Sequence, residues 1–238
     1  MQSGLEILSW SFWSPETRQP QDWPASAPSP PATAAAVPAS AIPALHRRRM
    51  STLSKMAVQV ALEATAAQPA DFLVFCSQHG ELNRTRELLT AIVGRTELSP
   101  ASFSQSVHNA AVGLFSIITE SRVPATSLAA GAGTFAYGWI EAEAFLAANL
   151  RSRVLLVSYD EPVPEEYRPF VTHDQRAHAQ ALVLGVAATG GLTLASSGAG
   201  DEERRPLGPL FLAWALSGRP DFAVTAGGQG WVWRRARS

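Results

Sequence analysis

The stretch TSLAAGAGTFAYG, residues 126–138, contains a short apolar strand, a turn of small residues and the first part of a helix. Gly131 and Gly133 open the turn, and an Ala-rich pattern continues as a predicted helix over residues 134–150. The next segment, RVLLVSY at residues 153–159, is a short apolar run typical of a fully buried strand. Strands that alternate with helices in this way predict an α/β fold.

The segments on either side continue the alternation. Further strands are predicted at residues 5–13, 71–77, 180–187, 192–197 and 229–235, further helices at residues 52–67, 80–94, 106–120 and 209–217, and a loop at residues 95–103. The Gly190-Gly191 dipeptide between two of the strands predicts a hairpin. Residues 1–238 are therefore expected to form a single α/β domain with a mixed central sheet and helices on both faces.

Residues 20–43 are rich in Pro, Ala and Ser, within a Pro/Ala-rich segment that covers about residues 18–45. Proline lacks the amide hydrogen that helices and sheets require, so this segment is expected to be an extended surface loop. The single strand that precedes it cannot fold alone. We therefore interpret the loop as an insertion in one domain rather than a linker between two.

The composition excludes several classes of protein. With 19 Lys and Arg against 20 Asp and Glu, the net charge of -1 lacks the positive excess that binding along nucleic acid requires. The single cysteine, Cys76, excludes an intrachain disulfide framework and a cysteine-rich zinc site. No apolar run approaches the roughly 18–20 residues of a membrane span, and the N-terminus lacks the pattern of a signal peptide. We therefore expect a soluble, cytoplasmic protein.

Two clusters suggest cofactor or metal binding, and both signals are weak. The GAG motif at residues 131–133 follows a strand and opens a helix, but it lacks the third glycine and the acidic residue of a dinucleotide site. His173, Asp174 and His178 carry metal-binding groups, but a spacing of five does not place both histidines on one helix face. A polar loop is the preferred interpretation. No cofactor and no metal are predicted.

Candidate catalytic side chains also have simpler explanations. His108 lies near the start of a helix, but no GxSxG nucleophile motif occurs, so a histidine bonded to the backbone is favoured over a general base. Cys76 ends a buried strand, and His79 follows three residues later. Because free cysteine is among the most buried residue types, a core cysteine is favoured over a reactive thiolate.

Taken in order, four stretches resemble the N-terminal half of the β-ketoacyl-acyl-carrier-protein synthases, the thiolase-like condensing enzymes. RRMS at residues 48–51 is similar to the entry into the first helix of these synthases. FLVFCSQHGEL at residues 72–82 is similar to the strand and Gly-rich turn that follow it. SPASFSQSVHNAAVGLFSI at residues 99–117 and SLAAGAGTFAYG at residues 127–138 resemble the next segment and the turn that carries the nucleophile. The resemblance covers most of residues 1–197 and implies a thiolase-like half.

Two departures from this family bear on function. Counting back eight residues from Gly138 places Ala130, or a neighbour such as Gly131, where the synthases have their nucleophilic cysteine. The half that carries the two catalytic histidines is expected to be missing, because the chain stops at residue 238. The resemblance therefore implies a non-catalytic, chain-length-factor-like subunit that pairs with an active synthase and shapes its acyl tunnel. The short form is similar to subunits from bacterial aryl polyene gene clusters.

The resemblance also implies where such a subunit makes its contacts. The strand at residues 126–129, which includes Leu128, is expected to join the partner's sheet, because an unpaired apolar edge is a liability. The residues expected to line or close the tunnel are Phe103, Gln105, His108, Asn109, Phe135 and Tyr137. The cluster expected to dock the acidic acyl carrier protein is Arg47, Arg48 and Arg49. The alternatives are plain core aromatics and a solvated basic face.

Two other functions remain open at the level of sequence. One is a small hydrolase or acyltransferase that uses Ser127 or Cys76 as its nucleophile. The other is a structural or regulatory module that binds an unrelated protein. The size of the chain alone and with a co-expressed synthase distinguishes both from a paired subunit.

Overall fold

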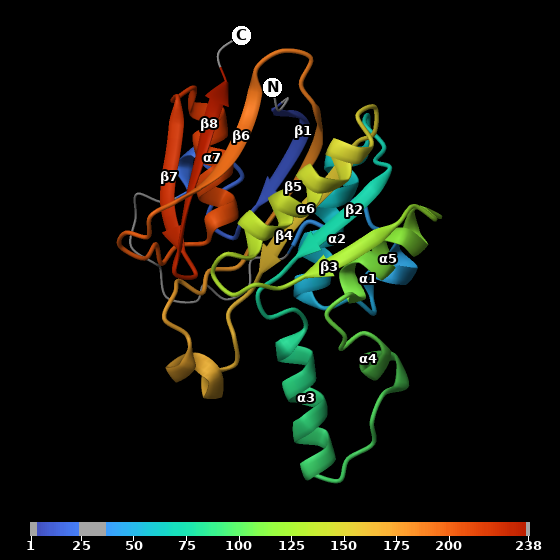
Figure 1. Ribbon diagram of the computed structural model, residues 1–238. Helices are drawn as coiled ribbons and strands as arrows, with labels where there is room; N and C mark the ends of the chain where they lie inside the picture. Colours follow the sequence, from blue (N-terminus) through green and yellow to red (C-terminus); the bar gives the residue numbers. More distant parts are fainter. Residues whose placement is uncertain (1–3, 24–36, 237–238) are drawn as a thin grey trace.

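The computed structural model describes residues 4–23 and 37–236 and contains one mixed sheet in the strand order β3-β2-β4-β5-β1-β6-β8-β7 (Figure 1). The strands are β1 (Leu5–Trp13), β2 (Phe72–Cys76), β3 (Ala125–Leu128), β4 (Val154–Asp160), β5 (His178–Val186), β6 (Gly191–Ser197), β7 (Asp221–Ala226) and β8 (Gln229–Ala236). β2 pairs in parallel with β3 and β4, and the other pairings are antiparallel. The predicted single α/β domain with a mixed sheet is confirmed.

Helices cover both faces of this sheet, as predicted. They are α1 (Ala44–Arg47), α2 (Thr52–Thr65), α3 (Leu82–Val93), α4 (Pro100–Ser104), α5 (Ala110–Ile118), α6 (Thr134–Ala148) and α7 (Leu207–Ser217), with short 3-10 helices η1 (Pro20–Asp22) and η2 (Glu165–Phe170). One core joins the sheet to α2 and α5, and a second joins the opposite face to α6 and α7. No helix in the described residues is long and apolar enough to cross a membrane.

The predicted hairpin between β5 and β6 is wrong, because β1 lies between these strands. Leu5 of β1 is the Cα partner of Val186 in β5 and of Leu192 in β6. The glycines at residues 190 and 191, both with positive φ, carry the chain across the end of β1 instead of closing a two-strand turn. The Gly4 amide donates to the Gly190 carbonyl at 3.3 Å. The two strands on either side of this glycine turn therefore do not pair with each other, because β1 separates them in the sheet.

A true two-residue hairpin occurs further on, between β7 and β8. Gly227 and Gly228 both have positive φ, and Ala226 pairs with Gln229 across the turn. This is the geometry that favours glycine at both central positions of a hairpin. The sequence analysis predicts no strand at residues 218–228, where the structure has β7.

Two segments predicted as loops contain ordered structure. α4 begins within the predicted loop at residues 95–103 and ends at Ser104, and the helix predicted at residues 106–120 begins at Ala110. In the Pro-rich segment, residues 24–36 lie outside the described residues, so the surface-loop prediction is not tested there. In the described flanks Trp23, Ala39 and Ile42 are buried, whereas most of their neighbours are exposed.

α3 and α4 project from the body of the molecule and are here called the arm (Figure 1). Neither helix contains a buried residue. On α3, the apolar side chains of Leu89, Ile92 and Val93 are exposed. The arm follows directly from β2 and returns through α5 to β3, so it is the crossover between two parallel strands.

Packing of α6 on the sheet depends on the absence of a side chain at Gly138. A Cβ atom at this position would overlap the Cys76 Sγ atom and press on Leu156. Cys76 and Leu156 lie on β2 and β4, so the helix crosses the two parallel strands at close range. The aromatic residues on the same helix complete the core, with Trp139 fully buried against Phe211.

Gly138→Ala is expected to lower the free energy of unfolding by about 1–3 kcal/mol, because the new methyl group overpacks the contact with Cys76. Cys76→Ala removes the Sγ atom, so the double variant should be more stable than the sum of the single effects predicts. Gly113→Ala is the matched control. Gly113 lies in α5 with open space where its Cβ would be, and alanine there should stabilise by about 0.5–1 kcal/mol.

Urea denaturation of the four variants measures these changes. Equal stability of Gly138→Ala and the wild type would contradict the close-approach argument. Additive effects in the double variant would show that Cys76 is not the group that the methyl meets.

Candidate functional site

A polar cavity of about 40 Å³ lies at the carboxyl ends of the parallel strands. Its walls come from the end of β2, the β3–α6 turn, the end of β4 and the two loops that precede β5 and α7. This volume is enough for a few water molecules. In α/β sheets, groups at the carboxyl ends of neighbouring strands converge, so this is where a site is expected.

Two carboxyl groups follow β4 at the edge of this cavity. Asp160 accepts hydrogen bonds from the Ser77 hydroxyl at 2.8 Å and the Gln78 amide at 2.9 Å. Burial outweighs these bonds and raises the pKa of Asp160 to about 6. Glu161 accepts from Asn83 Nδ2 at 2.9 Å, and burial raises its pKa to about 7.

Histidines and an arginine complete the polar wall. The rings of His79 and His173 stack 5.8 Å apart, and burial lowers the pKa of both. Burial also lowers the pKa of His178 to about 4. Arg176 donates from Nε to Asp174 at 2.6 Å and covers the ring of Trp23 at 4.7 Å. The histidines are therefore neutral near pH 7, and Arg176 is neutralised by its own ion pair.

The residues predicted as a polar loop, His173, Asp174 and His178, belong to the cavity wall, the first two in a loop and the third in β5. His178 is buried at the start of β5, with its Nδ1 3.0 Å from the Arg176 carbonyl oxygen. No group of three or more His, Cys, Asp or Glu side chains in residues 4–23 and 37–236 has a geometry that could hold a metal ion.

The β3–α6 turn brings Ala130 and Gly131 to this cavity region. The Thr134 hydroxyl accepts from the Ala130 amide at 2.9 Å and donates to the Gly131 carbonyl at 2.6 Å. Gly131 has a φ of 56°, the left-handed conformation that favours glycine. Gly131 and Thr134 line the cavity. The turn therefore presents small groups and backbone, and no thiol, at its apex.

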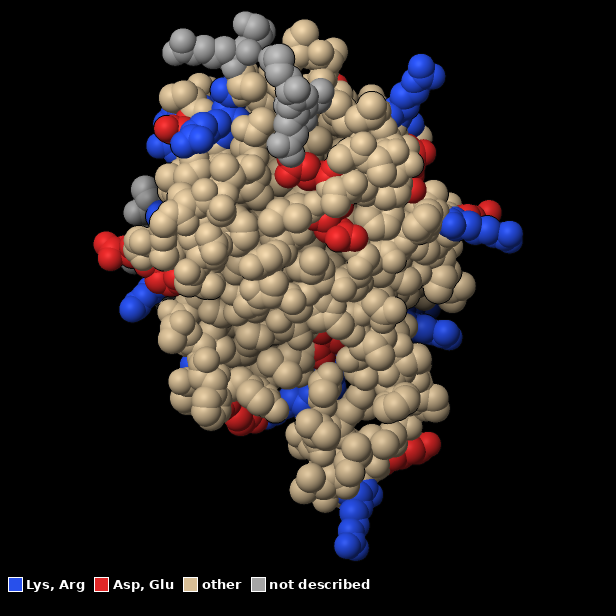
Figure 2. All heavy atoms as spheres, in the orientation of Figure 1, with Lys and Arg blue, Asp and Glu red and all other residues tan. Residues whose placement is uncertain are grey.

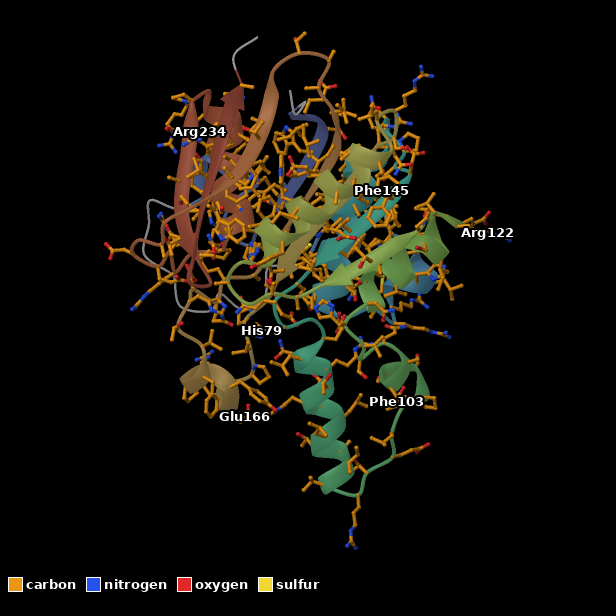
Figure 3. All side chains as sticks on the ribbon, viewed as in Figure 1. His79, Phe103, Arg122, Phe145, Glu166 and Arg234 are labelled. Carbon is orange, nitrogen blue, oxygen red and sulfur yellow. The ribbon has the colours of Figure 1, made fainter. Side chains whose placement is uncertain are left out.

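The structure separates the predicted tunnel residues. Phe103 lies on the arm with 68% of its surface exposed, and His79 lies at the base of the arm (Figure 3). Gln105 accepts a hydrogen bond from Arg84 at 2.9 Å. His108 Nε2 lies 2.8 Å from the Ser77 carbonyl oxygen, which is the backbone contact favoured for it. Asn109 is exposed, and Leu128 is partly buried at the end of β3.

Phe135 and Tyr137 point to opposite sides of α6. Phe135 is only 2% exposed and packs against Phe211 and Trp233, with ring centroids 5.0 and 6.1 Å away. Its position is that of a core aromatic. Tyr137 is 43% exposed on the outer face and contacts Trp231 edge-on at 5.2 Å.

The remaining predicted residues are placed as follows. Arg47, Arg48 and Arg49 are exposed at and after the end of α1, where Arg47 donates to the Ala39 carbonyl at 3.0 Å. Cys76 is fully buried, as expected for a core cysteine, and burial raises the pKa of its thiol. It is therefore neither accessible nor ionised as a nucleophile must be.

The sequence reasoning missed the carboxyl pair and the histidine stack. A signal for the carboxyl pair was present, because Asp160 and Glu161 directly follow the clearest buried strand in the chain. The stack of His79 with His173 joins residues far apart in sequence. No local pattern predicts such a contact.

Comparisons with known proteins agree with this architecture. The family model described as "Beta-ketoacyl synthase, N-terminal domain" matches residues 10–234. No curated protein matches the chain. A solved ketosynthase in complex with its chain length factor, from Xenorhabdus doucetiae, is 27% identical with a TM-score of 0.84, covering 98% of this chain and 99% of that chain.

Two more distant structures share the fold. The ishigamide ketosynthase/chain length factor is 13% identical with a TM-score of 0.62, covering 81% of this chain and 67% of that chain. A β-ketoacyl synthase from Burkholderia phymatum is 14% identical with a TM-score of 0.57, covering 83% of this chain and 65% of that chain.

Glu161→Gln is expected to stabilise the protein above pH 7 by about 1–3 kcal/mol, because it removes a buried charge and keeps the oxygen that accepts from Asn83. The folded-state pKa values of Asp160 and Glu161 lie above those of the unfolded chain. The stability that these carboxyls contribute is therefore full below about pH 4 and is lost as the pH rises to about 7.

The buried histidines oppose this trend, because their lowered pKa values cost stability as the pH falls below about 6.5. The difference in free energy of unfolding between Glu161→Gln and the wild type isolates the contribution of the Glu161 carboxyl. Chemical denaturation between pH 4 and 8 measures it, with exposed Glu97→Gln as the control. If this difference in free energy of unfolding does not change with pH, the raised pKa of Glu161 is contradicted.

Proposed function

The chain belongs to the β-ketoacyl synthase family through its N-terminal domain, and on that premise we propose that it is a non-catalytic, chain-length-factor-like subunit. In this proposal it pairs with a catalytically active β-ketoacyl-acyl-carrier-protein synthase and shapes the tunnel in which the partner's acyl chain grows. The products belong to the aryl polyenes, which are polyketide- and fatty-acid-like. The likeness to a ketosynthase solved with its chain length factor supports this role.

The observation that carries the proposal is the turn between β3 and α6. Condensing enzymes of this family hold an acyl group on a thiolate, and counting from Gly138 assigns that position here to Ala130 or a neighbour such as Gly131. The sole cysteine is buried in the core. Ser127, the alternative nucleophile, has a buried Oγ atom without a hydrogen-bond partner among the described residues, so no base activates it. These facts favour a subunit whose partner performs the chemistry.

Two uncovered surfaces support pairing. β3 is the last strand of the sheet, with β2 as its one neighbour in the described residues. α6 is largely apolar, with Glu141 and Glu143 half-buried, and Tyr137, Ile140 and Ala144 remain exposed on its outer face. Figure 2 shows that the face over α6 and β3 is mostly uncharged, with a few acidic side chains within it. Exposed apolar side chains gathered on one face are typical of an interaction site, so a partner surface here would complete the packing.

The register of β3 identifies which backbone groups face the open edge. The Leu73 amide donates to the Pro124 carbonyl at 3.0 Å. The Ser77 amide donates to the Leu128 carbonyl at 3.2 Å. Along a strand, alternate residues present their backbone groups to the same neighbour. Ser127 therefore presents its amide to the open side, where the partner's strand is proposed to pair.

Ser127→Pro is expected to prevent complex formation while the chain still folds, because proline removes an outward amide hydrogen and leaves the β2–β3 ladder intact. Ser127→Ala is the control, since it keeps the amide. Light scattering on chains co-expressed with the synthase measures pairing. Leu128→Pro should lose both pairing and stability, because Leu128 faces β2. A folded Ser127→Pro chain that still forms the complex at the wild-type yield would contradict strand pairing.

The segment at residues 103–109 is proposed to reach the partner's tunnel. Phe103 at its start is 68% exposed, so most of its ring is available to another surface. Gln105, His108 and Asn109 follow on the connection to α5. Bulk at a tunnel wall limits chain length, because an overlong acyl chain would overpack it.

Phe103→Ala is expected to shift the products of the complex to longer chains, and Phe103→Trp to shorter ones. Mass spectrometry of the released products measures the shift. Phe170→Ala is the matched control, because Phe170 is 82% exposed on η2 and lies outside the proposed segment. The purified chain without the synthase is the blank and should give no condensation product. Unchanged product lengths in both Phe103 variants would exclude this residue from the tunnel wall.

An acyl carrier protein is proposed as the second partner. Arg47, Arg48 and Arg49 are exposed together, which suits an acidic protein surface. Exposed ion pairs contribute only about 0–1 kcal/mol each, so this cluster would act mainly on the rate of encounter.

A further inference from the structure

The position of the arm is set by polar contacts rather than by hydrophobic packing. Neither α3 nor α4 buries a residue, and no side chain of these helices belongs to either hydrophobic core, although Leu82 and Leu88 are half-buried. A short helix without tertiary packing is only marginally stable in water. The contacts that tie the arm to the body therefore decide where its exposed tip lies.

Arg84 makes the central contact. Its guanidinium donates from one nitrogen to Gln105 Oε1 at 2.9 Å and from another to the Arg49 carbonyl oxygen at 3.3 Å. Its Nε lies 3.7 Å from a carboxylate oxygen of Glu81. The Arg84 side chain is only 12% exposed. One side chain thus joins α3, the connection between α4 and α5, and the backbone after α1.

Glu81 anchors this arrangement to α2. Its side chain is 3% exposed and accepts from the Ser51 hydroxyl at 2.6 Å and the Ser54 hydroxyl at 2.5 Å. Ser51 is also the residue that caps α2, because its Oγ accepts from the Ser54 amide at 2.9 Å. A carboxylate buried to this degree needs a counter-charge, and Arg84 supplies it.

Two further contacts hold the same segment from the other side. The Thr85 hydroxyl lies 3.3 Å from the Ser106 carbonyl oxygen. His108 bonds to the Ser77 carbonyl oxygen, and Gly80 packs directly against the His108 ring. Residues 105–108 are therefore fixed by side chains, while Phe103, just before them, is exposed.

We propose that Arg84 is a positioning residue that holds the tunnel-facing segment, residues 103–109, at a fixed place relative to the basic cluster Arg47–Arg49. The consequence for products rests on the proposed function, but the positioning itself does not. Arginine suits this role because its planar fork of donors reaches two acceptors at once, whereas lysine is a single point charge. Without the guanidinium of Arg84, residues 103–109 lose this fixed place, and the position of Phe103 relative to the partner changes.

The test uses variants of the chain co-purified with its synthase. Arg84→Met and Gln105→Met each remove one end of the central contact, and Gln105→Glu keeps an acceptor for Arg84. Arg86→Met is the matched control. Arg86 lies half a turn further along α3, is 45% exposed and pairs with Glu166 on η2, away from the segment. Hydrogen–deuterium exchange at residues 103–109 reports positioning, and mass spectrometry reports product length.

Arg84→Met and Gln105→Met are expected to speed exchange in this segment by about 10-fold or more, since each breaks a hydrogen bond to a charged group. The two should shift product lengths in the same direction, and the double variant should shift them no further than Arg84→Met. Gln105→Glu and Arg86→Met should match the wild type in both measurements. Arg84→Lys should fall between wild type and Arg84→Met.

Wild-type exchange at residues 103–109 in Arg84→Met would overturn the proposal. Wild-type product lengths despite faster exchange would overturn the link from the arm to the tunnel. If Arg84→Met does not fold, Gln105→Met decides, because it leaves the buried Glu81 paired. Failure of the proposed function has a different signature. In that case the wild-type chain forms no complex with a synthase, while faster exchange in purified Arg84→Met still shows positioning.

Discussion

The contact between α6 and the sheet at Gly138 is the constraint on which the other features depend. With no side chain at this position, the helix settles against Cys76 and Leu156. Its depth places the preceding turn, and with it Ala130, beside the polar cavity. The same depth turns the opposite face of the helix outward, where Tyr137 is exposed. A single close approach therefore positions both the turn without a thiol and the apolar surface proposed for pairing.

The central elements were predictable because their signals are local. β4 is buried on both faces and is therefore a continuous apolar run, and α2 begins just after Ser51, a residue type that caps helices. The strand order was not predictable in the same way. Gly190 carries a turn signal whether the flanking strands pair or not, and the insertion of β1 between them is a long-range event. Conversely, Gly227-Gly228 closes a real hairpin whose first strand went unpredicted.

In the candidate site, too, local features were predictable from the sequence and long-range contacts were not. The absence of a thiol from the β3–α6 turn could be read from the sequence, because Cys76 is its one cysteine. The two sides of α6 were harder to interpret, since Phe135 and Tyr137 are two residues apart yet occupy the core and the surface. Arg84 could not be predicted, because its partners Gln105 and Arg49 are 21 and 35 residues away in the chain.

The buried carboxyl after β4 has a structural role that requires no chemistry at the cavity. Its raised pKa means that Asp160 costs stability near neutral pH. What it holds is the β2–α3 turn, through the Ser77 hydroxyl and the Gln78 amide. The Ser77 carbonyl in turn accepts from His108 in the segment that Arg84 also holds. The cavity and the arm are thus one polar network, which gives these charged groups a structural role.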